Sequence, residues 1–256
     1  MYTRLNPKLI TMRSLTKILL AVILVTACGG AFAKSIATTS LNTNEIVDRH
    51  LSGFNAVNIA GPYDVYITQG PAESVKVDAP SDMMSKILTE VNGGVLKIYS
   101  KHEYWNWGFL WGHHKKIRVF VTIKDVTGIH VSGSGDAYFK NGITAGALKL
   151  SVSGSGDMTG RLDAKTLECN ISGSGDMRLS GRADNSSVSV TGSGDFSAGD
   201  LVTITSTVHV AGSGDARINA SQRVDASVSG SGDVHYTGGA KSISSHKSGS
   251  GDISRF

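Results

Sequence analysis

The chain has 256 residues, of which 40% are apolar, and its mean hydropathy is near zero, so it can fold and bury a core. The isoelectric point of 9.0 comes from the first 33 residues, which hold four basic residues and no acid; the other 21 basic residues balance 21 acidic ones. This balance argues against a nucleic-acid partner, because phosphate binding needs a basic surface.

Residues 1–33 have the pattern of an export signal. Basic residues precede the apolar run Ile18–Val25, which is too short to span a bilayer as a stable helix. Translation from Met12 would give a more compact signal of the same kind. The sequence therefore predicts an exported protein that resides in the periplasm, on the outer-membrane surface or outside the cell.

Two processing sites compete within this signal. The small-x-small site Ala31–Ala33 predicts cleavage before Lys34 and is favoured. The alternative is a lipobox in which Cys28 is lipidated, which would be the protein's one attachment to a membrane. Apart from Cys28, only Cys169 remains after cleavage, so no disulfide framework is expected, and Cys169 is predicted to be a small core residue.

Residues 34–48 are predicted to form a polar linker, and residues 49–256 a single β-solenoid domain. Within it, residues 49–126 look like degenerate opening coils, because Gly61–Asp64 stands where the later repeats have Gly-Ser-Gly-Asp. Further strand-like stretches in this region are Val75–Val77, Val95–Ile98 and Ile117–Ile123, and Ser81–Met84 is expected to add a helical turn.

A tryptophan-rich loop at residues 101–116 interrupts the opening coils and contains all three tryptophans of the chain. Aromatic rings of this kind suit stacking on sugars, insertion at a membrane interface or a protein hot spot. The candidate ligand contacts are Tyr104, Trp105, Trp107, Phe109 and Trp111. The alternative, which is slightly favoured, is a lid over the open end of the apolar core.

Histidines occur at both ends of this loop, at His102, His113 and His114. Adjacent histidines on a strand point to opposite faces, and no cysteine or carboxylate triad joins them. A solvated base of the loop is therefore expected here, and no metal site is predicted.

Residues 127–256 contain seven copies of Gly-Ser-Gly-Asp, which we call the GSGD corners. They begin at Gly133, Gly154, Gly173, Gly192, Gly212, Gly230 and Gly249. A period near 19 residues is typical of a solenoid. Apolar residues alternate with polar ones on both sides of each corner, as in strands with one buried face. The sequence thus predicts an all-β fold, a parallel β-helix-like superhelix of two sheets with coils of ~19 residues.

The last coil breaks the pattern. Lys247 and Ser245 stand where the other coils have apolar core residues. A polar last coil prevents an exposed edge from recruiting another chain, so this coil is predicted to cap the stack.

Each corner ends in an aspartate, and three roles compete for these residues. They are Asp136, Asp157, Asp176, Asp195, Asp215, Asp233 and Asp252. The favoured role is structural: the second glycine of the corner takes a positive φ, and Asp accepts backbone N–H groups left unpaired at that corner. Calcium binding between coils is a weaker alternative, and no other cofactor is expected. Catalysis is the weakest, because paired catalytic carboxylates need different environments and seven similar positions offer none.

The combination of Gly61–Gly70, the strand Gly94–Ile98 and the GSGD series resembles the bacterial family described as putative auto-transporter adhesin, head GIN domain. The similarity covers residues 50–256. It implies a two-sheet β-superhelix that is exported or surface-attached, with a proposed role in adhesion and no catalytic residues to transfer.

The sequence therefore predicts an exported interaction module without catalytic activity that binds an unidentified glycan or protein of an envelope or host. One alternative is an enzyme acting on polysaccharides, which would be supported by a groove with a non-repeating Asp/Arg/Lys cluster; the sequence pattern reveals none. A purely structural envelope scaffold is the other alternative. Neither the ligand nor the oligomeric state follows from the sequence.

Overall fold

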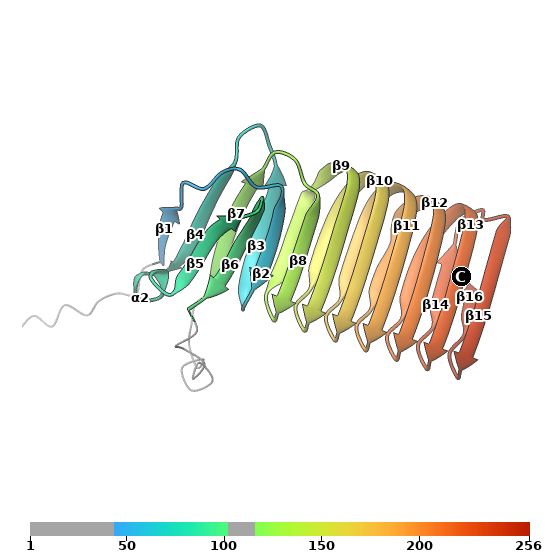
Figure 1. Cartoon of the computed structure of the whole chain (residues 1–256). Coiled ribbons are helices and arrows are strands. Elements are labelled where there is room, and N and C mark those ends of the chain that lie inside the picture. Colours follow the sequence, from blue (N-terminus) through green and yellow to red (C-terminus); the bar gives the residue numbers. More distant parts are fainter. Residues whose placement is uncertain (1–43, 102–115) are drawn as a thin grey trace, which may run out of the picture. The chain divides into compact units, whose positions relative to one another are not determined.

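The computed structural model describes residues 44–101 and 116–256, which form an all-β solenoid, as the repeat predicts (Figure 1). The predicted signal peptide, Cys28 and most of the tryptophan-rich loop lie outside the described residues.

The GSGD coils stack in parallel, each coil pairing with the next through equivalent residues. Their strands are β8 (Gly128–Gly133), β9 (Asp136–Gly154), β10 (Met158–Gly173), β11 (Met177–Gly192), β12 (Phe196–Gly212) and β13 (Ala216–Gly230). From β9 to β13 each strand runs through the second corner of its coil, so that one strand contributes to both sheets (Figure 1). The pairs Met158–Met177 and Ile171–Val190 confirm the register expected from the repeat alignment.

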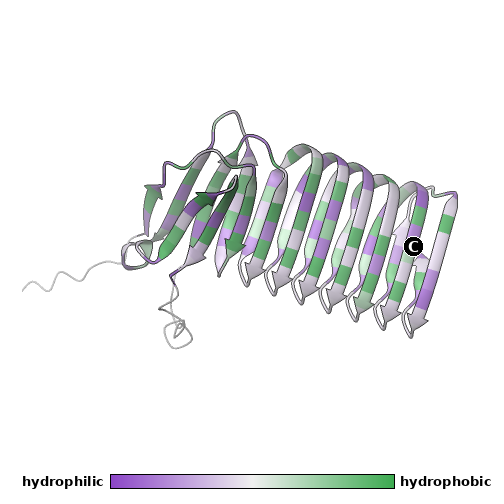
Figure 2. Ribbon diagram, viewed as in Figure 1, coloured by the Kyte–Doolittle hydropathy of each residue, from purple (hydrophilic) through white to green (hydrophobic). Residues whose placement is uncertain are grey.

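The core consists of the alternating apolar rows between the two sheets. Ile171, Val190 and Val210 are at most 2% exposed, and so are the residues that follow the aspartates, such as Met158 and Met177. Figure 2 shows the result as alternating hydrophobic and hydrophilic bands along each strand. Cys169 is fully buried in this core, as predicted, and burial raises the pKa of its thiol.

The opening coils are stacked in a different order from the chain. Their strands are β2 (Ala56–Ala60), β3 (Tyr63–Gln69), β6 (Val95–Ser100) and β7 (Ile117–Ile123). Strand β2 pairs with both β6 and β8, and β3 pairs with both β7 and β9, all in parallel. The β2–β3 coil therefore lies between the later β6–β7 coil and the first GSGD coil. Asp64 pairs in register with Asp136, as the alignment of Gly61–Asp64 with GSGD predicts.

Antiparallel strands cover the outer end of the opening coils. These are β1 (Asn44–Asp48), β4 (Ser74–Pro80) and β5 (Ile87–Asn92): β4 pairs with β7 and β1, and β5 pairs with β6. The expectation that coils fill this whole region is therefore only partly correct. The linker assignment for residues 44–48 is wrong, because they form the β1 edge strand, whereas the helical turn at Ser81–Met84 is confirmed as α2.

The GSGD corner is built differently from the expectation. The positive φ belongs to the first glycine, for example +128° at Gly173, and not to the second. The second glycine is required by close approach, because a Cβ on Gly175 would lie 2.0 Å from the carbonyl oxygen of Gly156 in the preceding coil. The first glycine is thus needed both for the turn and for the close spacing of the coils, since a Cβ on Gly173 would lie 2.3 Å from the oxygen of Gly154, and the second is needed for the spacing alone.

The stack ends with β14 (Val234–Thr237), β15 (Ser242–Gly249) and β16 (Ile253–Arg255). Ser245 and Lys247 pair with the core residues Ala226 and Val228, and β15 is exposed along its whole length. These observations confirm the polar last coil. The Nζ of Lys247 donates to Oδ1 of Asp252 at 3.1 Å.

Candidate ligand-binding face

The structure brings together a surface row that the sequence pattern does not single out. The second residue after each corner aspartate points outward, and parallel pairing aligns these residues across the coils. The row runs through Tyr66, Tyr138, Thr159, Arg178, Ser197, Arg217 and His235. We call the surface that carries this row the variable face.

An aromatic ladder forms the end of the variable face that lies on the opening coils. The ring of Tyr66 stacks between those of Phe120 and Tyr138, with centroids 5.4 and 5.2 Å apart. The rings cover one another's faces, so the ladder mainly stabilises neighbouring strands and leaves little ring face for a ligand. Burial first, and then the hydrogen bond that its hydroxyl donates to Asp136, raise the pKa of Tyr138.

Charged groups flank this ladder. Lys116 pairs with Asp64 at 3.3 Å, and hydrogen bonding to that carboxylate raises the pKa of Lys116. Arg118 pairs with the buried Asp78 at 3.2 Å. Lys140, on the first GSGD coil, lies over the Tyr138 ring, 5.6 Å from its centroid. Lys116 and Arg118, the two cations that flank the ladder, are therefore each paired with a carboxylate.

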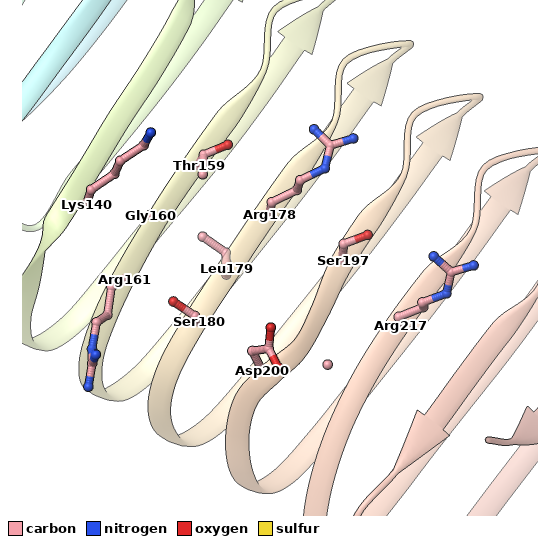
Figure 3. Close-up of a pocket in the computed structure, with 11 residues that line it drawn as sticks. Lys140, Thr159, Gly160, Arg161, Arg178, Leu179, Ser180, Ser197, Asp200 and Arg217 are labelled. Carbon is pink, nitrogen blue, oxygen red and sulfur yellow. The ribbon is translucent and has the colours of Figure 1, made fainter.

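Beyond Lys140 the variable face is hollowed and basic. A hollow of about 460 Å³ crosses β9 to β13. Four cationic side chains and one carboxylate line it: Lys140, Arg161, Arg178, Arg217 and Asp200. Thr159, Ser180 and Ser197 add hydroxyl groups. In Figure 3, Lys140, Arg178 and Arg217 extend to one side of the hollow and Arg161 to the other. We call this hollow the basic groove.

The cations of the basic groove are only partly neutralised. Arg178 donates to Oδ2 of Asp176 at 2.8 Å and lies 3.8 Å from Oδ2 of Asp157. Within residues 44–101 and 116–256, Arg161 and Arg217 have no ion-pair partner. Arg161 also lines a second hollow of about 510 Å³, at the other corner of the coils. The groove can therefore offer exposed guanidinium groups to an anionic ligand.

The corner aspartates form a repeated hydrogen bond to the neighbouring coil. Oδ1 of Asp157, for example, accepts the backbone N–H of Asp176 at 2.9 Å, and the same bond repeats from Asp136 through to Asp252. The aspartates thus accept backbone N–H groups as predicted, but the donor belongs to the corner of the following coil. The last member, Asp252, has no following coil, and its hydrogen bond from Lys247 first, and then one from the Ile253 N–H, lower its pKa.

No metal centre is evident in the described part of the chain, since it contains no group of three or more His, Cys, Asp or Glu side chains able to hold an ion. Calcium binding along the aspartate column stays a prediction.

The predicted aromatic contacts Tyr104, Trp105, Trp107, Phe109 and Trp111 lie outside the described residues, as do the three loop histidines. The flanking strands define only their place in the chain. The chain leaves β6 at Ser100 and enters β7 at Ile117, where the later coils pass between the sheets through a GSGD corner. Ser100 is hydrogen-bonded to the buried hydroxyl of Tyr63, which is fixed beside Gly61.

The basic groove was missed because its members are far apart in sequence and come from five coils. A signal for it was nevertheless present in the repeat alignment. The position directly after the aspartate is apolar in all seven coils, whereas the second position after it varies from tyrosine to arginine, serine and histidine. The fold does not fix the residue type at this outward position, so the position is free to carry ligand contacts.

Comparison with solved structures supports the same fold. A putative adhesin from Bacteroides fragilis is 25% identical, with a TM-score of 0.79 over 84% of this chain and 97% of that chain. A putative lipid binding protein from Parabacteroides distasonis is 24% identical, with a TM-score of 0.67 over 84% and 98%. A putative adhesin from the same species is 23% identical, with a TM-score of 0.68 over the same shares. The two Parabacteroides structures, being less similar in sequence, indicate the fold alone.

No curated protein matches the chain. Among the described residues, no helix is long and apolar enough to cross a membrane. The model of the family described as putative auto-transporter adhesin, head GIN domain, matches residues 53–240, from just before β2 to just after β14. Because this match spans well over half of the sequence, the chain belongs to the head GIN domain family of putative auto-transporter adhesins.

Proposed function

We propose that the protein is an exported, non-catalytic interaction module that binds a component of the cell envelope or of another cell's surface. The basic groove carries this proposal, because it gathers Lys140, Arg161, Arg178 and Arg217 on one face of the sheet. The family description and the Bacteroides fragilis neighbour, both named for adhesion, agree with it. The predicted signal at residues 1–33 supports export.

The groove also bears on the alternative of a polysaccharide-acting enzyme. We expected no non-repeating Asp/Arg/Lys cluster from the sequence, and the structure assembles one. However, Asp200 is the one carboxylate among the residues that line the groove, and glycoside hydrolysis ordinarily uses two. The arrangement therefore favours binding over hydrolysis. Incubating the protein with envelope polysaccharides should release neither reducing ends nor unsaturated products.

A binding screen of the mature protein against glycans and envelope components tests the proposal. We expect at least one ligand whose binding is lost when the groove cations are replaced. A second arm replaces Trp105, Trp107 and Trp111 with alanine. Lost binding with an unchanged melting temperature would assign recognition to the tryptophan-rich loop, and a lowered melting temperature would favour its role as a lid. If neither set of changes affects binding to isolated envelopes or cells, the proposed function is wrong.

A further inference from the structure

We propose that the basic groove binds an extended acidic polysaccharide in which a charged sugar alternates with a neutral one. This inference rests on the proposed function and specifies the ligand class of the same site. Its basis is the period of the cations along the solenoid axis, in addition to their number.

The cations on one side of the groove come from alternate coils. Arg178 belongs to β11 and Arg217 to β13, two coils apart in the row of the variable face. Lys140 of β9 stands two residues beyond the row member Tyr138, with its Nζ over that ring, and extends to the same side as the two arginines (Figure 3). Between them, β10 and β12 contribute the uncharged residues Thr159 and Ser197 to this row, whereas their charged residues Arg161 and Asp200 belong to the neighbouring row, which passes through Ser180. Since neighbouring coils are ~4.8 Å apart, the cations repeat about every 10 Å along the axis.

This period matches a polysaccharide better than a peptide. A pyranose unit in an extended chain advances by about the same distance as one coil, so a charge on every second sugar would meet a cation on every second coil. An extended peptide places side chains of one face about 6.7 Å apart and would fall out of step with the cations. The hydroxyls of Thr159, Ser180 and Ser197 can exchange hydrogen bonds with sugar hydroxyls between the charged positions.

The net positive charge of the groove favours a negatively charged ligand. Arg161 faces the row from the other side, and Asp200 is the single carboxylate of the lining. Arg178 is held by Asp176, which fixes the direction of its guanidinium group while leaving other N–H donors available. Carboxylate or sulfate groups would form charge-assisted hydrogen bonds here, and neutral sugars would not.

Serine is the replacement in the variants, because the fold already accepts serine at neighbouring outward positions. Ser197 is the register partner of Arg217, and Ser180 lies on the same outward row as Arg161, so serine fits at these outward positions. The test variant is Lys140→Ser with Arg217→Ser, which frees no paired carboxylate among the described residues. The control is Lys149→Ser with Arg223→Ser, which removes the same charge from the same two strands. Both control residues are exposed and lie outside the groove, in ion pairs with Glu168 and Asp225.

The probe is a fluorescent octasaccharide in which a uronic acid alternates with a neutral hexosamine, titrated into the mature protein by anisotropy. We expect binding that weakens as salt rises, weakens at least tenfold in the test variant and is unchanged in the control. Absence of binding, or equal binding by the test variant, overturns the inference. The envelope and cell screen then decides separately whether the proposed function survives.

Two competitors test the chemistry of the ligand. Equal binding of the carboxyl-reduced octasaccharide would refute the requirement for charge while leaving a glycan-binding groove in place. Equal competition by polyglutamate would show that any polyanion is accepted and would refute the match of periods.

Discussion

Replacing Gly175 with alanine tests the account of the GSGD corner. Gly175 is the second glycine of its corner and does not have a positive φ, so alanine suits its backbone. The obstacle is the preceding coil, because the new Cβ would lie 2.0 Å from the oxygen of Gly156 and 2.9 Å from a methyl group of Val152. Real Cβ atoms essentially never come within 3.0 Å of such neighbours, so the corner would have to move by about 1 Å.

A shift of this size breaks the hydrogen bonds that join the two corners. Three are at stake: from the N–H groups of Ser174 and Gly175 to the oxygen of Gly154, at 2.9 and 3.1 Å, and from the N–H of Asp176 to Asp157, at 2.9 Å. Each would lengthen to about 4 Å, beyond the range of a hydrogen bond. At about 1 kcal/mol net for each bond, Gly175→Ala should lower the free energy of unfolding by about 3 kcal/mol.

Urea denaturation followed by circular dichroism measures this loss, and Gly146→Ala is the matched control. Gly146 also lacks a positive φ and has no neighbouring atom within 4 Å of a new Cβ. It should therefore be neutral or stabilise by up to about 1 kcal/mol, because alanine restricts the unfolded chain. If the two variants differ by less than about 1 kcal/mol, close approach does not explain the second glycine.

The other predictions concern the aspartate column, the last coil and the buried thiol. Asp195→Ala removes the acceptor for the Asp215 N–H and should cost about 1–3 kcal/mol in urea, whereas Asp195→Asn keeps an acceptor and should cost less; equal losses would contradict the bond. Lys247→Val puts an apolar residue on an exposed edge strand and should cause concentration-dependent association in sedimentation, while Lys247→Arg should not. The hydrogen bond from Lys247 lowers the pKa of Asp252. The stability that this bond adds to the last coil is therefore fully present above the ordinary Asp pKa and is lost as the pH falls through the lowered pKa. Amide exchange in the last coil should accelerate over that acidic range in the wild type but not in Lys247→Met. Cys169 should react with a thiol reagent only after unfolding, and rapid reaction of the native protein would contradict its burial.

The coils were predictable because their determinants are local and repeated. Alternation around residues such as Ile171 and Val190 specifies which side chains face inward, and the spacing of the corners specifies the length of a coil. Together they predict the register of the parallel strands. The polar residues Ser245 and Lys247 predict the end of the stack for the same reason, since they depart from a pattern that six other coils obey.

The order of the opening coils was not predictable in this way. Strands β2, β6 and β8 all carry the alternation of a solenoid strand, and nothing local specifies which of them are neighbours. Strands β4 and β5 alternate similarly but pair antiparallel, because short connections lead the chain back over the open end. An alternating pattern indicates a buried face without indicating the partner or its direction.

The two glycines of the corner show a similar limit. Sequence reasoning assigned the positive φ to the second glycine, because a turn requires one and either position could supply it. The true reason for the second glycine is the preceding coil, whose carbonyl oxygen occupies the space of a side chain. Contacts between residues ~19 positions apart become visible only once the coils are stacked.

The same stacking turns unremarkable single residues into a candidate site. Arg178 and Arg217 are ordinary exposed arginines in sequence, separated by two coils, yet the parallel register places both in one row on either side of Ser197. A repeat protein has little freedom at its inward positions and corners, because each must fit the coils before and after it. Its outward positions are not constrained in this way and can change one coil at a time. In a solenoid of this kind, the coils that carry a charged outward residue would determine which long ligand binds. The spacing of Arg178 and Arg217 by two coils along the basic groove is an arrangement of this type.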